Sequence, residues 1–246
     1  MQQSNGYIIG FAAVMTIVLG GLLAGAAMAL KPAQQKAKAL DTKKQILSAV
    51  MPTKGVDKTY LEGVYNAQIK SFVLDFEGNE VKKDDEGNDL IAEKVNIRKE
   101  SKKDENQRFY PVYLFYEEGN TSTPVAYIIP IYGKGLWDDI WGYLAVKPDF
   151  NTIRGVSFDH KSETPGLGAR ITEVAVQERY KDQKLFDEGG QLVSVRMLKG
   201  ENNQNLNEHQ VDGMSGATIT ANGVNKMIKE YVSCYEVYFS KMRKAS

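Results

Sequence analysis

Cysteine and histidine are almost absent from this chain, and their scarcity excludes several kinds of redox site. The 246 residues include one cysteine, Cys234, so this chain alone provides no disulfide, CxxC pair, haem attachment motif or iron–sulfur site. The two histidines, His160 and His209, lack the spacing of a metal site. The sequence also contains no Walker A motif, dinucleotide-binding motif or recognisable nucleophile–base pair. Any redox chemistry is therefore expected to depend on a bound cofactor.

Net charge is missing as well, and its distribution divides the chain. The 31 basic and 31 acidic residues cancel, which argues against nucleic acid as a partner. The first thirty residues hold no charged side chain. Residues 7–30 would form a helix about 36 Å long, enough to cross a bilayer. Residues 27–29 (Ala-Met-Ala) resemble a signal-peptidase site, but the basic start and short apolar core of a signal peptide are missing. We therefore predict a retained transmembrane anchor over residues 1–30, with cleavage as the alternative.

The anchor offers two further signals. Gly21 and Gly25 form a small-xxx-small pair that would let another helix approach closely, although small residues are common in such helices in any case. The lysines that follow the anchor favour a cytoplasmic position for that side, a rule that weakens before a large domain. These are Lys31, Lys36, Lys38, Lys43 and Lys44.

The remaining chain predicts a stalk followed by one domain. Residues 31–60 are interpreted as a helical stalk or linker, in which Asp41 caps a short helix that runs to about Met51. Residues 61–246 form the domain. Within it, the highly charged segment 74–108 is predicted to be a solvated hairpin or an exposed insertion.

Alternating and helical patterns predict the elements of this domain. Strands are expected over residues 111–116, 125–132, 136–146, 152–158 and 191–198, and helices over 171–180 and 219–242. The last helix has an apolar stripe that is assigned to the core, formed by Val224, Met227, Ile228, Tyr231, Tyr235 and Phe239. Strands in meander order with helices set apart predict an α+β fold: one N-terminal transmembrane helix, then a single mixed domain with a mainly antiparallel sheet.

Three loop segments could hold a cofactor. Residues 133–137 place flexible backbone beside Trp137, whose indole could stack on a flat ring. Residues 160–168 form a turn shaped by glycine and proline that frees backbone N–H groups. Residues 212–218 (Asp-Gly-Met-Ser-Gly-Ala-Thr) present a threonine hydroxyl on small residues just before the last helix, whose amino end favours anions. Each segment alone also fits a structural role: an ordinary turn, a core tryptophan, or Thr218 or Thr220 as a helix cap.

In this order behind a single span, the three segments resemble a membrane-anchored family that binds FMN covalently. That family includes the FMN-carrying anchored subunit of the bacterial sodium-translocating NADH:quinone oxidoreductase and its counterpart in the related Rnf complex. The resemblance covers essentially the whole chain and implies FMN joined through its phosphate to Thr218 by a dedicated flavin transferase. It implies that the transferase recognises Asp212, Gly213, Ser215, Gly216, Ala217 and Thr218. It implies further cofactor-binding residues, namely Trp137, Glu163, Thr164, Gly166, Leu167, Gly168, Ser215, Gly216 and Ala217.

The resemblance also implies a role. The chain is expected to relay electrons in the sodium-pumping complex, with the NADH, quinone and sodium sites on other subunits and no acid–base residue of its own. The charged segment before Arg108 makes the chain longer than expected for the Rnf counterpart, which remains an alternative. A non-redox anchored binding or scaffold module is the other. Expected partners are the other subunits, the transferase and lipid. The domain is expected on the periplasmic side of a bacterial inner membrane, against the lysine count.

Overall fold

The structure, a computed structural model, describes residues 4–120 and 122–245. The chain divides into two compact units, residues 1–41 and 42–246. Its elements, in chain order, are α1 (Asn5–Ser48), α2 (Lys58–Gln68), β1 (Ile69–Leu74), β2 (Glu80–Val81), η1 (Ala92–Lys94), α3 (Ile97–Glu100), η2 (Glu105–Gln107), β3 (Tyr110–Phe115), β4 (Ala126–Lys134), β5 (Asp139–Val146), β6 (Ile153–His160), η3 (Gly168–Thr172), α4 (Val174–Gln177), η4 (Glu178–Tyr180), β7 (Arg196–Met197), β8 (Gln210–Val211) and α5 (Thr218–Ala245).

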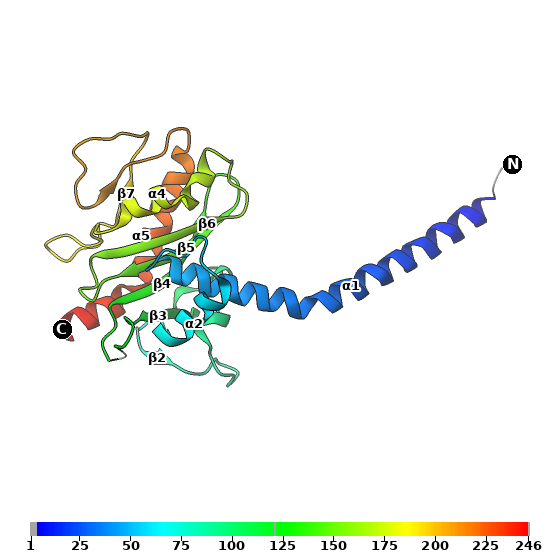
Figure 1. The fold of residues 1–246 in the computed structure, drawn as a ribbon, viewed down its shortest axis with the longest axis horizontal. Helices are drawn as coiled ribbons and strands as arrows, with labels where there is room; N and C mark the ends of the chain where they lie inside the picture. Colours follow the sequence, from blue (N-terminus) through cyan, green and yellow to red (C-terminus); the bar gives the residue numbers. More distant parts are fainter. Residues whose placement is uncertain (1–3, 121, 246) are drawn as a thin grey trace. The chain divides into compact units, whose positions relative to one another are not determined.

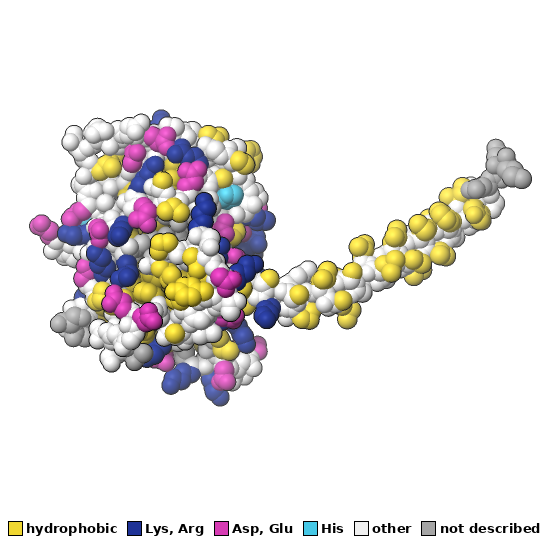
Figure 2. All heavy atoms as spheres, viewed as in Figure 1, with side chains coloured by type: hydrophobic (Ala, Val, Ile, Leu, Met, Phe, Trp, Pro, Cys, Tyr) yellow, Lys and Arg dark blue, Asp and Glu magenta, His cyan; other side chains and the backbone are white. Residues whose placement is uncertain are grey.

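The first unit consists of most of α1, which is long and apolar enough to cross a membrane. Its apolar side chains are exposed, and Figure 2 shows hydrophobic atoms covering its N-terminal half. Residues 1–3 of the predicted anchor lie outside the described part. The prediction that Asp41 starts a separate helix is wrong, because α1 continues through Pro32 and Asp41 to Ser48. The Ala-, Lys-, Gln- and Leu-rich sequence after Pro32 favours helix strongly enough to maintain it.

A six-stranded antiparallel sheet forms the centre of the second unit, in the order β2-β1-β3-β4-β5-β6 (Figure 1). The predicted α+β class and the meander from β3 to β6 are confirmed. Side chains alternate between the two faces of each strand, as the period of a β-strand requires. On β4, for example, Tyr127 and Ile129 lie in one core and Ile128 lies in the other.

The sheet therefore separates two apolar cores. One face packs against α2 and the end of α1, which contribute Leu61, Ile46 and Leu47. The other face packs against α5, as Figure 1 shows. The predicted stripe of α5 belongs to this second core, and its Tyr235 hydroxyl donates to the carbonyl oxygen of Pro111 at 2.8 Å. The amino end of α5 is thus fixed to the sheet, which matters for the loop that precedes it.

Three predicted segments differ from the structure. The helix expected over residues 171–180 is a series of short turns, η3, α4 and η4. The strand expected over residues 191–198 is reduced to β7, because Ser194 has a φ of 66° that an extended strand cannot accommodate. The charged segment does include the exposed turn between β1 and β2, but its Ala92 is buried and accepts a hydrogen bond from Tyr113.

The predicted domain boundaries, an anchor over 1–30, a stalk over 31–60 and a domain over 61–246, stay predictions. The compact second unit itself begins at Thr42, so the last turns of α1 already belong to its core.

Candidate functional site

A single buried carboxylate connects elements from all parts of the site. Glu163 lies in the loop after β6 and is 4% exposed. One carboxylate oxygen accepts the backbone N–H of Trp137, with N and Oε1 3.0 Å apart, and the other accepts the Thr220 hydroxyl at 2.6 Å. The β4–β5 loop, the loop after β6 and the first turn of α5 therefore meet at Glu163. The backbone N–H of Glu163 donates in turn to Nδ1 of His160, which gives this histidine a place in the turn.

Glycines allow this close approach. A Cβ atom on Gly135 or on Gly168 would lie 2.4 Å from an oxygen of Glu163. A Cβ atom on Gly223 of α5 would lie 2.3 Å from the carbonyl oxygen of Lys134. These distances are far below van der Waals contact, so the end of β4, the turn after β6 and α5 can pack together only without side chains at these positions.

The turn after β6 has a well-defined shape. The carbonyl oxygen of Thr164 accepts the N–H groups of Leu167 and Ala169, each at 3.1 Å, and Gly166 has a φ of 75°. The Thr164 hydroxyl accepts the indole N–H of Trp137 at 3.1 Å. Trp137 is nevertheless 67% exposed, and Leu167 is exposed as well. The structure thus presents an indole and a leucine side chain to solvent beside Glu163; Trp137 is not a core residue.

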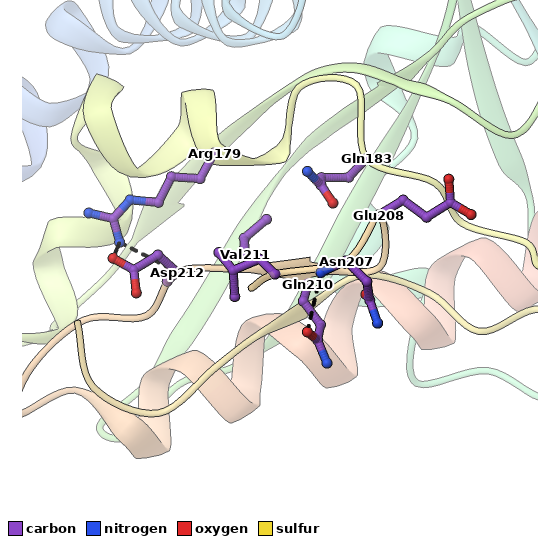
Figure 3. Close-up of a pocket in the computed structure, with 8 residues that line it drawn as sticks. Arg179, Gln183, Asn207, Glu208, Gln210, Val211 and Asp212 are labelled. Carbon is purple, nitrogen blue, oxygen red and sulfur yellow. Dashed lines mark hydrogen bonds and ion pairs between the residues drawn. The ribbon is translucent and has the colours of Figure 1, made fainter. Parts of the chain in front are cut away.

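The loop before α5 is held at its first residue. The Asp212 carboxylate accepts the N–H groups of Asn202 and Asn203 at 3.0 and 2.9 Å, and Arg179 donates to the carbonyl oxygens of Asp212 and Gly213. Figure 3 shows Arg179 extending from η4 toward Asp212 beside a shallow pocket. Burial acts to raise the pKa of Asp212, but these hydrogen bonds outweigh it and lower the pKa. The carboxylate therefore serves to shape the loop.

The middle of this loop is partly buried and partly exposed. Gly213 is enclosed, because a Cβ there would lie 1.9 Å from the carbonyl oxygen of Leu198. Met214 and Ala217 are also buried. Ser215 and Gly216 form the exposed tip, where Gly216 has a φ of 74° and its α-carbon faces the Leu167 side chain. The folded loop thus offers only Ser215, Gly216 and part of Thr218 to a partner.

Thr218 is the first residue of α5 and is half-buried. Within the described residues no hydrogen bond engages its hydroxyl group. The neighbouring Thr220 hydroxyl, by contrast, is committed to Glu163. Of the two threonines that could carry a group or cap the helix, Thr218 is the one whose hydroxyl is free.

Comparison with known proteins agrees with this arrangement. The model of a family described as an FMN-binding domain matches residues 135–233, which contain most of the three segments. The chain is 33% identical to the NqrC subunit of the Na(+)-translocating NADH-quinone reductase of Haemophilus ducreyi, over 88% of this chain and 85% of that protein. Identity to the same subunit of Neisseria meningitidis serogroup A is 32%, over 94% and 92% of the two chains.

This chain belongs to the NqrC family of Na(+)-translocating NADH-quinone reductase subunits. Solved structures agree. A crystal structure of the subunit from Parabacteroides distasonis is similar with a TM-score of 0.73 and 31% identity, covering 86% of this chain and 97% of that one. The structure of NqrC from Shewanella oneidensis is similar with a TM-score of 0.69 and 28% identity, covering 85% and 100%.

An ion cluster at the start of β5 supports the site of this NqrC family member. The buried carboxylate of Asp139 accepts from the Tyr132 hydroxyl at 2.6 Å and from Nε of Arg98 at 2.9 Å, and it also pairs with Lys134. Arg98 comes from the charged segment before β3, which thereby reaches the strand end beside Trp137. Burial acts to raise the pKa of Asp139, but its hydrogen bonds to Lys134 and Tyr132 lower it.

Several residues of the site were not anticipated from the sequence. Thr220 was considered only as a helix cap, and Arg179, Arg170 and Glu201 were not considered at all. Each interacts with a partner far along the chain, such as Arg170 with Glu201 at 2.6 Å, so no local pattern reveals it. The exposed side chain of Ile219, directly after Thr218, was also missed. A large apolar residue outside the helix stripe was its available signal. The other histidine, His209, places Nδ1 2.7 Å from the carbonyl oxygen of Lys184.

Proposed function

We propose that this chain is the electron-relay subunit of a Na+-translocating NADH:quinone oxidoreductase and that it carries FMN joined through its phosphate to Thr218. The free hydroxyl of Thr218, at the meeting point of the three segments, is the observation that supports attachment most directly. All the relatives described above are NqrC proteins, which favours this complex over the Rnf complex.

The surroundings of Thr218 fit an FMN group. The exposed apolar side chains of Trp137, Leu167 and Ile219 come from the three joined segments and offer surface for a flat ring. The small residues at the loop tip leave room near the hydroxyl, and the amino end of α5 favours an anionic phosphate. FMN, when bound, supplies the capacity to take up and release electrons.

The chain's own residues would bind and orient this group. Glu163 fixes the Trp137 backbone and the Thr220 side chain relative to each other, so both sides of the site keep one geometry. Thr164 holds the indole of Trp137 through its hydroxyl. Thr164, Gly166, Leu167 and Gly168 would border the ring as the family resemblance implies, and Ser215, Gly216 and Ala217 would border the phosphate.

Attachment requires a maturation enzyme, which we propose to be a flavin transferase that recognises residues 212–218. The Thr218 oxygen would form a bond to the phosphorus of an activated flavin nucleotide, while the activating group leaves and the hydroxyl proton is released. The chain is membrane-anchored through α1. We propose that its domain lies in the periplasm, where the transferase acts and where other subunits of the complex are its redox partners.

Intact mass and in-gel fluorescence of the protein from its native host test the attachment. Unaltered protein should give a fluorescent band after denaturation and an FMN mass on the peptide that contains Thr218. Thr218→Val should remove both signals, and its complex should assemble without quinone reduction. Thr220→Val is the matched control, because it removes the adjacent hydroxyl and should keep the flavin. Flavin that persists in Thr218→Val would overturn the attachment site, and a colourless native protein would favour a non-redox scaffold.

A further inference from the structure

An ion pair crosses between two loops of the site. Arg170 lies in η3, two residues after Gly168, and Glu201 lies in the loop between β7 and β8. Nη2 of Arg170 is 2.6 Å from Oε1 of Glu201, and the two side chains are 23% and 25% exposed. Glu173 is a second, more distant acidic neighbour, with its carboxylate 3.4 Å from Nε of Arg170. A single guanidinium group therefore faces two carboxylates.

The Glu201 carboxylate also faces the loop that leads to Thr218. Arg170 is the main cause that lowers the pKa of Glu201, burial acts against it, and the hydroxyl and backbone N–H of Ser215 lower the pKa further. A guanidinium, a hydroxyl and a backbone N–H close to the amino end of a helix are groups that a phosphate ester accepts hydrogen bonds from. A carboxylate of this protein occupies them.

We propose that Arg170 and Ser215 form an anion site beside Thr218, which Glu201 fills in the unmodified protein and yields to the phosphate of attached FMN. This inference rests on the proposed function. It assigns Arg170 the role of phosphate ligand, which the family motifs do not contain, and it makes Glu201 an internal substitute for that phosphate.

Charge and backbone conformation make such an exchange feasible. A phosphate near Arg170 would place three anions around one guanidinium, and the repulsion would expel one of them. Glu201 is free to leave by side-chain rotation. It lies between Gly200 and Asn202, which both have positive φ, in a segment without regular structure. The backbone of this segment can stay in place, since Asp212 holds the N–H of Asn202.

The site can be tested without flavin, on full-length protein made in a host that lacks the transferase. Inorganic phosphate is the probe, and its binding is followed by ³¹P line broadening. Glu201→Gln keeps the side-chain shape but removes the competing charge, so we expect phosphate affinity to rise roughly threefold. Glu208→Gln is the matched control: it removes the same charge from the same β7–β8 loop, where Glu208 pairs with Lys184 at 2.7 Å, and should leave the affinity unchanged.

Arg170→Gln should abolish the gain in the Glu201→Gln background, with circular dichroism to confirm that the variant folds. Equal affinities in Glu201→Gln and Glu208→Gln would overturn the proposal, whatever the outcome for Arg170. This titration does not require attached flavin, so a native protein without FMN at Thr218 would refute the proposed function separately.

The exchange itself is tested by comparing modified and unmodified protein. Carbon NMR of the Glu201 carboxyl group should show its pKa below the usual range before attachment and a higher pKa afterward, because Arg170 has changed partner. Identical titration curves in the two forms would show that Glu201 stays in place and would overturn the exchange.

Discussion

Removal of the Glu163 side chain should loosen the whole site, because two donors from distant segments depend on it. Glu163→Ala leaves the Thr220 hydroxyl, which is buried, without an acceptor. It also frees the backbone N–H of Trp137, which water can partly satisfy because that residue is exposed. An unsatisfied buried donor costs about 1–3 kcal/mol, so we expect a total loss of about 2–3 kcal/mol in unfolding free energy. For a domain of this size that is a decrease of about 5–10 °C in Tm.

The conservative variant separates hydrogen bonding from packing. In Glu163→Gln, the amide oxygen can accept from the N–H of Trp137, and the amide nitrogen can donate to the Thr220 hydroxyl, which also has acceptor capacity. Both hydrogen bonds survive in a neutral and weaker form, so the loss should be about 1 kcal/mol or less. Thermal unfolding of the full chain in detergent, followed by circular dichroism, measures both variants.

Glu118→Ala, at an exposed position in the β3–β4 connection, is the control for loss of a carboxylate. Its Tm should equal that of the unaltered chain. If Glu163→Ala unfolds at the same temperature as this control, Glu163 does not hold the three segments together. If Glu163→Gln is as damaging as Glu163→Ala, the charge itself, and not the pair of acceptors, is what the site needs.

Two further variants test the loop contact and the ion cluster. Gly216→Ala places a Cβ in the left-handed region, 2.7 Å from the side chain of Leu167, whereas Gly166→Ala has the same backbone strain with open space around it. Both should lose about 1–2 kcal/mol, with the larger loss and slower flavin attachment in Gly216→Ala; equal effects would mean that Leu167 moves aside freely. The lowered pKa of Asp139, where burial is outweighed by Lys134, means that its ionised form stabilises the fold above about pH 4 and that this contribution is lost as pH falls through the folded-state pKa. Asp139→Asn should therefore lower the Tm at pH 7 and have little effect near pH 3, and an effect independent of pH would contradict this reasoning.

Local patterns were enough to predict the central sheet and the last helix. In β4 and β5 the apolar residues are buried on both faces, so long β-branched and aromatic runs indicated strands directly. In α5 the stripe that includes Val224 and Tyr235 has helical spacing, and it is the face that packs on the sheet. These elements form through interactions between near neighbours and one apolar surface, which a sequence displays.

The segments that were predicted wrongly depend on single backbone conformations. The positive φ of Ser194 interrupts an otherwise convincing strand pattern, and no neighbouring residue indicates it. The continuation of α1 through Asp41 depends on the helix that already exists before it, so a good capping residue is not used as a cap. In both cases the residue type allowed two conformations, and the surrounding structure selected the less expected one.

For the site, the motifs identified the segments but not the bonds between them. Glu163 and Thr220 are 57 positions apart, and their hydrogen bond requires the packing of α5 on β4. The sequence placed Glu163 beside the flavin. The structure directs both of its oxygens to protein donors, which gives it a positioning role, while direct contact with the flavin stays a prediction. Sequence motifs therefore indicate which residues matter before they indicate what each one touches.

The position of Thr218 suggests why a tether suits an electron relay here. The hydroxyl belongs to the first residue of a helix whose next turn is buried through Ala221 and Val224 and fitted against β4 at Gly223. A group joined to that oxygen would pivot about a point as rigid as the core, whereas a group held only by the exposed tip at Ser215 would move with the loop. Electron transfer depends on distance, so the fixed point limits the reach of the flavin. The walls formed by Trp137 and its neighbours then limit its direction. It follows that changes in the Glu163 network should alter the flavin's orientation and potential while leaving the attachment itself intact.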